Sequence, residues 1–302
     1  MRHSIEADRE KLFRLPGILF FLVLAASGIC QENSALFPVS VGGAWGYINA
    51  TGKLVIKPHF ERATTFEDGL ATVRIGQFWG YIDRTGDLVI RPQFDDAEPF
   101  SEGLALVRLC DRYGYINREG SYVINPYYTE AVSFSQGLAS VHLEDRKLII
   151  DRSEKIIAED SYDEVKQYQS GLAPARKERL WGYIDIKGNW VIPPTFRSAE
   201  PFSDGVALVK QKGLYGWIDS KGAFMIPPTF KVVGQENSAF SEGLAAVLLE
   251  KRWGYINKQG KVALPGKYDW AEPFRHGLAK VYVGDGIGYI NKRGEFVWKP
   301  TD

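Results

Sequence analysis

Carboxylates are numerous among the side chains in this sequence that could do chemistry, because Asp and Glu together number 37 of 302 residues. Two carboxylates on opposite sides of a sugar can hydrolyse a glycosidic bond. However, Asp83, Asp151, Asp185 and Asp219 stand at one recurring place, just after a "WGYI"-like segment. A turn explains such a residue, because its side chain accepts hydrogen bonds from its own backbone. We therefore rank a glycan hydrolase last among the functions considered.

Histidine and cysteine indicate no other reactive centre. The histidines are scattered, and those after the first 30 residues substitute for other residues at repeated positions: His59, His142 and His276. Without a cluster of His and Cys, a tetrahedral zinc site is not predicted. The sequence also lacks a Gly-x-Ser-x-Gly nucleophile motif and a phosphate-binding glycine loop. We predict a protein that is not an enzyme and has no cofactor or metal, with Cys110 as a core residue in a strand.

Basic side chains recur at one position on the exposed side of successive predicted strands. They are Arg74, Arg108, His142, Arg176 and Lys210, here called the basic ladder. If neighbouring repeats stack, the ladder forms a positive stripe that could bind an anionic chain or partner. The alternative is local pairing with acids such as Glu102 and Asp204, because surface charge pairs are common.

Trp270 is the second candidate binding residue. It stands where other copies have Arg62, Asp96, Glu130, Glu164 or Ser198. An aromatic side chain at a usually polar place could be an exposed binding residue, or it could pack on the linker beside it. The recurring tryptophans are interpreted as core instead: Trp45, Trp79, Trp181 and Trp253.

A repeat of 34 residues organises these candidates. Trp-Gly or a variant recurs at residues 45, 79, 113, 181, 215, 253 and 287, and "KLIID" (147–151) marks a degenerate fourth copy. The sequence therefore contains eight copies within residues 44–302, with one insertion at 231–239. Residues 31–43 contain a lead-in and the first strand, "FPVSV".

The pattern inside each copy predicts strands and not helices. "GLALVRL" alternates between two faces, "WGYID" forms a second strand, and a third strand such as "DLVIRP" ends at proline, which cannot donate to a sheet. Between the second and third strands, glycine supplies the positive φ of a hairpin turn; four of these glycines are Gly86, Gly120, Gly188 and Gly222. Each copy is predicted to be a three-stranded antiparallel meander. The linker rings, such as Phe94 and Phe100, should plug the join between neighbouring sheets.

Residues 1–30 differ from the repeats. Basic residues precede an apolar run from Leu15 to Ala26, and small residues follow. This layout is typical of a secretory signal peptide, so we expect a periplasmic or extracellular protein. An uncleaved signal anchor or a lipid on Cys30 is the alternative attachment to a membrane. Basic and acidic residues both number 37, and this balance argues against nucleic acid as a partner.

The recurring "WGYIDxxGxxVIxPxF" followed by "FSxGLAxV" resembles the WG-repeat family of bacterial proteins. The resemblance runs from about Ala44 to Pro300 and departs at Lys147–Leu148, Ile287, Tyr113 and Tyr215. It implies an all-β repeat protein, often exported, with no established activity and no catalytic residues to transfer.

Eight such units could stack as an open curved solenoid or close as an eight-bladed propeller-like ring. No strand is left over to be exchanged into the last unit, so the open solenoid is preferred. The function predicted first is an exported, non-catalytic scaffold that binds a protein or a cell-envelope polymer. The alternative is a structural subunit of a surface complex.

Overall fold

The computed structural model describes residues 35–231, 234 and 238–301. All of them belong to one compact unit, Ser34–Asp302. The predicted signal peptide and part of the predicted insertion lie outside the described residues.

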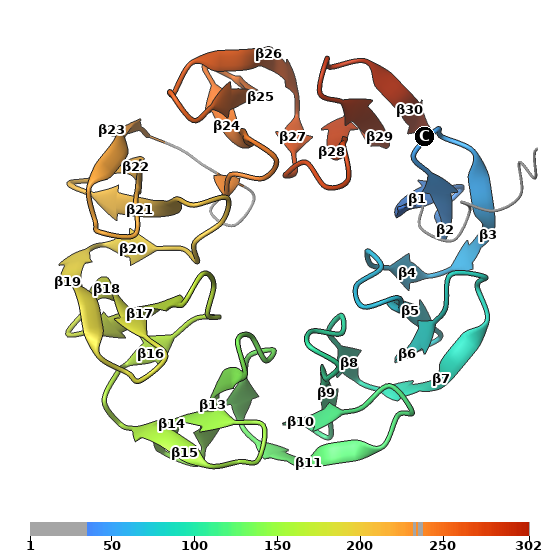
Figure 1. Cartoon of the computed structure of the whole chain (residues 1–302). Helices are drawn as coiled ribbons and strands as arrows, with labels where there is room; N and C mark the ends of the chain where they lie inside the picture. The colour runs from blue at the N-terminus through green and yellow to red at the C-terminus, as the bar shows by residue number, and fades with distance from the viewer. Residues whose placement is uncertain (1–34, 232–233, 235–237, 302) are drawn as a thin grey trace, which may run out of the picture. The chain divides into compact units, whose positions relative to one another are not determined.

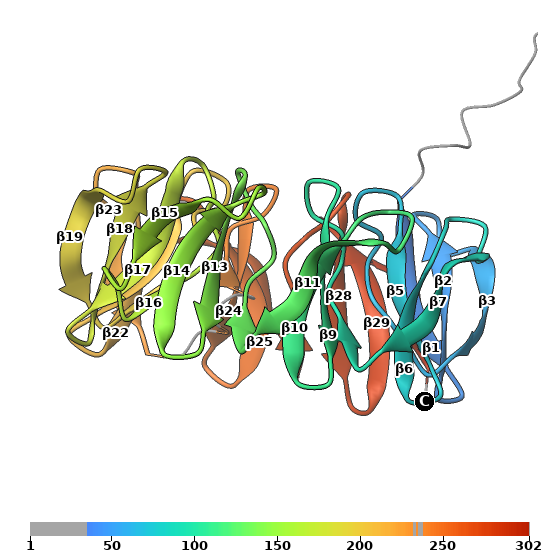
Figure 2. The same ribbon diagram turned by 90° about the horizontal axis from the view of Figure 1, so that it is seen from below.

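The described chain folds into eight small antiparallel sheets, or blades, arranged in a ring (Figure 1). Figure 2 shows the same ring edge-on, with the blades standing side by side. Blade 1 consists of β1 (Leu36–Val41), β2 (Ala44–Asn49) and β3 (Leu54–Phe60), and blade 2 of β4 (Arg62–Ala63), β5 (Ala71–Ile75), β6 (Phe78–Ile82) and β7 (Leu88–Phe94). Blade 3 consists of β8 (Asp96–Ala97), β9 (Ala105–Leu109), β10 (Arg112–Ile116) and β11 (Tyr122–Tyr128), and blade 4 of β12 (Glu130–Ala131), β13 (Leu138–Leu143), β14 (Arg146–Asp151) and β15 (Ile156–Glu159).

The second half of the ring is built in the same way. Blade 5 consists of β16 (Glu164–Val165), β17 (Leu172–Lys177), β18 (Leu180–Asp185) and β19 (Trp190–Phe196), and blade 6 of β20 (Ser198–Ala199), β21 (Ala207–Gln211), β22 (Leu214–Ile218) and β23 (Phe224–Phe230). Blade 7 consists of β24 (Leu244–Leu249), β25 (Arg252–Asn257) and β26 (Val262–Tyr268), and blade 8 of β27 (Trp270–Ala271), β28 (Leu278–Val283), β29 (Gly286–Asn291) and β30 (Phe296–Thr301). The prediction of an all-β repeat is thus confirmed.

The ring is closed, so the preferred prediction of an open solenoid is wrong and the propeller-like alternative is right. Blade 8 packs on blade 1 through a shared core in which Tyr289 contacts Phe37, with ring centroids 5.4 Å apart. The buried Tyr289 hydroxyl also donates to the carbonyl oxygen of Pro38 at 2.8 Å. The prediction failed because it required an exchanged strand as a latch. Packing between sheet faces joins blades 8 and 1 instead, as it joins the other blades.

Six of the blades gain a short fourth strand from the linker, which corrects the predicted three-stranded unit. In blade 3, for example, Asp96 and Ala97 pair with Arg108 and Val107 at the inner edge. Each linker therefore crosses from the outer strand of one blade to the inner edge of the next. In the described part of the chain, blades 1 and 7 have three strands.

The turn between the second and third strands has the predicted chemistry. In blade 2, the Asp83 carboxylate accepts hydrogen bonds from the backbone N–H groups of Thr85 and Asp87, at 2.9 and 3.1 Å. Gly86 has a φ of 96° and packs on Ile56 of blade 1. The four glycines predicted for this role all have positive φ, at Gly86, Gly120, Gly188 and Gly222.

The glycine of the Trp-Gly pair is required by a close crossing of two strands. A Cβ on Gly182 would lie 2.3 Å from the carbonyl oxygen of Ile192 and 2.8 Å from the nitrogen of Pro194. The pairing of β18 with β19 shifts register at this point, and such a bulge bends the outer strand. Blade 4 has Leu148 at this place, where it pairs with Glu159 in the short strand β15. The leucine fits there because β15 is short and contains no proline, so it does not cross close to Leu148 as β19 crosses close to Gly182.

Aromatic residues join each blade to the next. Phe100 of the blade 3 linker is buried against Tyr81 of blade 2, and the ring centroids are 4.8 Å apart. The Tyr81 hydroxyl donates to the carbonyl oxygen of Glu98 at 2.9 Å. The rings therefore lie in the joins between sheets, as predicted.

Blade 6 keeps this joint with different residues. It has Trp217 at the tyrosine place, and the indole N–H donates to the carbonyl oxygen of Ser238 at 3.2 Å. Ser238 is fully buried and lies in the part of the predicted insertion that the structure describes. Its carbonyl oxygen takes the place of the linker carbonyl that accepts from tyrosine in blade 2.

Candidate functional site: the central cavity

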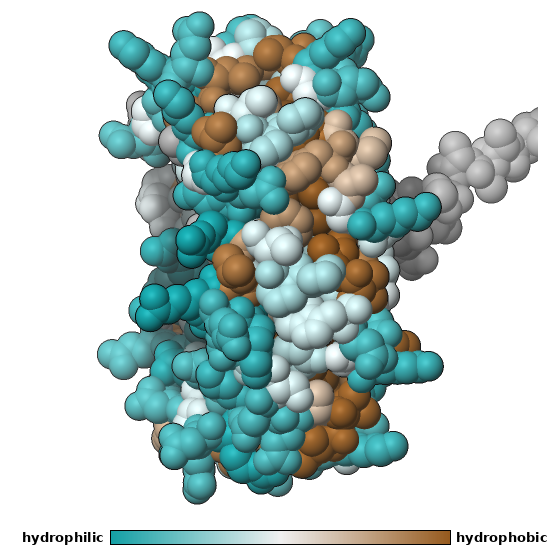
Figure 3. Space-filling view, turned by 90° about the vertical axis from the view of Figure 1, so that its left-hand side faces the viewer, coloured by the Kyte–Doolittle hydropathy of each residue, from teal (hydrophilic) through white to brown (hydrophobic). Residues whose placement is uncertain are grey.

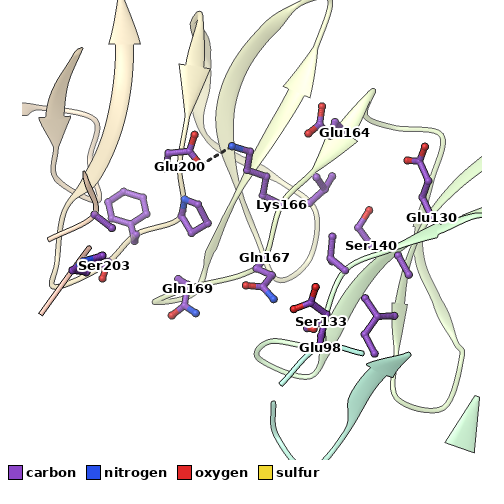
Figure 4. Close-up of a pocket in the computed structure, with 18 of the residues that line it drawn as sticks. Glu98, Glu130, Ser133, Ser140, Glu164, Lys166, Gln167, Gln169, Glu200 and Ser203 are labelled. Carbon is purple, nitrogen blue, oxygen red and sulfur yellow. Dashed lines mark hydrogen bonds and ion pairs between the residues drawn. The ribbon is translucent and has the colours of Figure 1, made fainter. Parts of the chain in front are cut away.

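A cavity with a volume of about 810 Å³ lies at the centre of the ring. Figure 4 shows the side chains that line it. They come from blades 3 to 8, on the inner strands, on the loops before the first long strands and, in blades 3 and 4, on the first long strands themselves. The short inner strands position these side chains, because each one pairs with the first long strand of its blade.

The lining is polar and varies from blade to blade. At one repeated position the chain has Thr64, Glu98, Val132, Lys166, Glu200, Ser238 and Glu272. Gln167 and Gln169 of blade 5 and Ser133 of blade 4 also line the cavity. Turn glycines and core aromatics recur with few changes, because every blade needs them. Of the seven residues at the repeated position, four line the cavity: Glu98, Val132, Lys166 and Glu200.

Charges in the lining are arranged in pairs. Lys166 Nζ lies 2.6 Å from Glu200, whose carboxylate is almost completely buried (Figure 4). Lys166 also lies over the ring of Trp181, 5.0 Å from its centroid. A buried carboxylate needs such a partner, because loss of the cation leaves an uncompensated charge. The pair therefore ties blade 5 to blade 6 beside the cavity.

Four residues of the basic ladder form ion pairs with nearby acids, and the fifth lies over an aromatic ring. Arg74 lies 3.7 Å from Glu61, and Arg108 lies 2.9 Å from Asp111. His142 lies 2.9 Å from Glu130 and Arg176 lies 3.0 Å from Glu164, and both acids stand directly opposite in the sheet register. Lys210 lies over the Tyr215 ring, 4.7 Å from its centroid.

The ladder residues thus have local partners, although the partners are not the acids named from the sequence. Glu102 pairs with Arg152, and Asp204 pairs with Lys258. Of the ladder, only His142 lines the cavity. Binding through the ladder remains a prediction.

Trp270 lies on the inner strand of blade 8 and is half-buried. It packs against Trp253 of blade 7, with ring centroids 4.5 Å apart, and faces Tyr282 in the register of its own blade. The other recurring tryptophans also border the blade cores, with Trp181 and Trp253 buried and Trp45 and Trp79 partly buried. Cys110 contradicts its prediction: it is exposed in a hairpin turn after β9, with a φ of 50°.

Neither a metal site nor a membrane span appears in the described part of the chain. No group of three or more His, Cys, Asp or Glu residues is placed to hold a metal ion there. No helix in that part is long and apolar enough to cross a bilayer.

The sequence did not predict the cavity residues Glu98, Lys166, Gln167 and Gln169. They lie in what looked like a linker, since the inner strand has only two residues. One signal was available: these are positions at which aligned copies differ while their neighbours repeat.

The fold is a closed ring of eight β-blades around a polar cavity. Seven segments of the chain match a family model described as WG containing repeat, at residues 45–77, 79–109, 113–145, 149–181, 181–215, 215–253 and 253–286. The chain belongs to this family. The eighth Trp-Gly variant recognised in the sequence, Ile287–Gly288, follows the last matched segment and lies on β29 of the last blade.

Solved structures of similar fold are distant in sequence. The crystal structure of a eukaryotic initiation factor is 10% identical with a TM-score of 0.57, covering 89% of this chain and 96% of that one. The dihydro-heme d1 dehydrogenase NirN, in complex with DHE, is 15% identical with a TM-score of 0.58, covering 88% and 74%. The extracellular domain of a putative hybrid two-component system from B. thetaiotaomicron is 10% identical with a TM-score of 0.53, covering 89% and 44%. At these identities the likeness concerns the fold alone. A search of curated proteins found no match.

Proposed function

We propose that this protein is an exported, non-catalytic scaffold that binds a partner protein or a cell-envelope polymer at the central cavity. One observation carries the proposal: a polar cavity of about 810 Å³ is lined from six blades by the residues in which the repeats differ. Most joints between blades repeat around the ring, and apart from the Lys166–Glu200 pair the differences at the cavity are not part of them. A concave site with convergent polar groups is the usual form of a binding site.

The non-catalytic part of the proposal rests on the roles of the carboxylates. Four glutamates line the cavity, and three of them, Glu130, Glu164 and Glu200, are each paired with a basic side chain of the protein. The repeated turn acids bond their own backbone, and Asp185 accepts from two N–H groups at 2.8 and 2.9 Å. A general acid or nucleophile needs a carboxyl group that can reach the substrate.

Site-specific photo-crosslinking in the native envelope tests the proposal. A photoreactive amino acid replaces Gln167 in the cavity, and the matched control replaces Lys187, an exposed turn residue of the same blade. We expect one dominant adduct at position 167 and none of that mass at position 187. Equal labelling at both positions, or none at either, contradicts binding at the cavity.

A structural role in a surface complex is the second candidate, and the outer strands support it. Val55, Val89, Val123 and Val191 hold one repeated place on these strands, and between 46% and 48% of each side chain is exposed. Apolar side chains lie among polar ones on the outer surface of the ring (Figure 3). Burial of these valines in an assembly would stabilise it. Purification from the envelope in a fixed stoichiometry that Val89→Lys and Val123→Lys disrupt, and that cavity variants leave intact, favours this role.

A further inference from the structure

In blades 2 to 8 a tight turn precedes the first long strand and carries backbone donors. In blade 4 this turn contains Gln136 and Gly137, both with positive φ. Its ends are joined by two backbone hydrogen bonds between Ser135 and Leu138. The N–H groups of Gln136 and Gly137 consequently have no partner within the turn and point outward.

The preceding blade supplies a carboxylate to these donors. Glu102 of blade 3 accepts hydrogen bonds from the N–H groups of Gln136 and Gly137 at 2.7 and 2.9 Å. Arg152 of blade 4 lies 2.7 Å from the same carboxylate. These bonds, together with the arginine, outweigh desolvation of the carboxylate and lower the pKa of Glu102.

The same joint occurs at three other places in the ring. Gly103, Gly243 and Gly277 each donate an N–H to a carboxylate of the preceding blade. The carboxylates belong to Asp68, Asp204 and Glu242. The structure thus shows four times that this turn binds a carboxylate.

The joint between blades 5 and 6 has the turn without the carboxylate. Asp204 and Gly205 form the blade 6 turn, with φ values of 53° and 84°. Ser170 of blade 5 stands at the place of the acid, and Ser220 of blade 6 stands at the place of the base. Among the described residues, the N–H groups of Asp204 and Gly205 have no hydrogen-bond partner in the protein. Both residues are exposed.

The carboxylate of Asp204 itself does not prevent an anion from binding to this turn. The side chain of Asp204 is directed to blade 7, where it accepts the Gly243 N–H at 2.7 Å and pairs with Lys258 at 3.0 Å. Ser203, next to the turn, and Gln169, next to Ser170, both line the central cavity. The turn therefore lies at the edge of the site already described.

We propose that the Asp204–Gly205 turn binds a carboxylate of the partner, in the way that its sister turns bind Asp68, Glu102, Asp204 and Glu242. This inference deepens the proposed function and rests on it for the partner. Backbone N–H groups bind a carboxylate by charge-assisted hydrogen bonds whatever residue carries it. An Asp or Glu side chain and a chain terminus share this chemistry.

Titration of the isolated protein with sodium acetate, followed by amide NMR at constant ionic strength against sodium chloride, tests the turn without the partner. We expect saturable downfield shifts of the Asp204 and Gly205 amide protons, several-fold larger than those of Gln136 and Gly137, which Glu102 already occupies. Equal shifts at the two turns overturn the inference.

A variant built from the protein's own pattern adds a second test. Ser170→Glu supplies the acid that stands at positions 102 and 242, so we expect it to remove the acetate response at Gly205. An unchanged response in this variant also overturns the inference. Ser170→Ala is the matched control and should keep the response.

Two peptides distinguish the source of the carboxylate. One has an internal Glu and an amidated end, and the other has a free carboxyl terminus and no acidic side chain. A larger Gly205 shift with one of them assigns the group. If acetate and both peptides fail while crosslinking at position 167 succeeds, this inference is wrong and the proposed function stands.

Discussion

The glycine of the Trp-Gly pair gives the sharpest test of how a blade is built. In Gly182→Ala, the added Cβ would lie 2.3 Å from the carbonyl oxygen of Ile192. An ordinary C···O contact is about 3.3 Å, so the two strands must separate by about 1 Å. The obstructing atoms are backbone atoms of β19, and rotation of a side chain therefore cannot relieve the overlap. We expect a loss of about 3 kcal/mol in the free energy of unfolding.

Urea and thermal unfolding, followed by tryptophan fluorescence, measure this loss. At about 2–4 °C for each kcal/mol in a protein of this size, the melting temperature should fall by roughly 6–12 °C. Gly171→Ala is the matched control in the same blade, because its Cβ would meet no atom within 4 Å although its φ is 83°. The control should cost about 1–2 kcal/mol from backbone strain alone. If Gly182→Ala costs no more than the control, the crossing does not explain the glycine.

Three further predictions concern hydrogen bonds between and within blades. Tyr183→Phe removes the donor to the Glu200 carbonyl oxygen, 2.9 Å away in a buried site, and should cost about 1–2 kcal/mol in urea unfolding. Glu102→Gln removes the charge that holds the next turn, and should cost about 1 kcal/mol, less in high salt. The backbone N–H of Asn189, with that of Lys187, lowers the pKa of Asp185. Because its folded pKa lies below the unfolded value near 3.8, Asp185 stabilises the protein above pH 4 and loses this contribution as the pH falls.

Each of these predictions has a control. Tyr113→Phe removes a hydroxyl from a half-buried ring at the Trp-Gly position and should be close to neutral in urea. For Glu102, a loss that does not change between low and high salt contradicts the electrostatic joint. Asp185→Asn keeps the turn acceptor, as Asn257 does in blade 7. Its unfolding midpoint should therefore fall less between pH 6 and pH 3 than that of the unmodified protein.

The local structure could be predicted because each repeat encodes its own turn and core. Asp83 and Gly86 specify a hairpin by their own backbone preferences, and the alternation in "GLALVRL" specifies a half-buried strand. These signals do not depend on the neighbouring blade. They were correct wherever the copies keep the pattern.

Ring closure and the cavity could not be predicted in the same way. Closure depends on the small rotation from one blade to the next, summed over eight blades, and no single copy contains it. The inner strand has two residues, too few to show periodicity, so the sequence predicts a linker at Glu98 and Lys166. The pairing of Arg176 with Glu164 depends on register between that strand and the next. Register was not assigned for a segment interpreted as a linker.

Closure by face packing also bears on chain connectivity. Tyr289 donates to a carbonyl of blade 1 as Tyr81 donates to one of blade 3. The boundary between the first and last blades therefore uses the same kind of contact as the internal boundaries, although Pro38 and Phe37 of β1 take the place of linker residues. The covalent connection is then dispensable at any one boundary. A circularly permuted gene that links residue 301 to residue 35 and opens the chain at the linker after β15 should yield the same ring. Duplication of a single blade during evolution would therefore not need to preserve a first or last blade with its own closing structure.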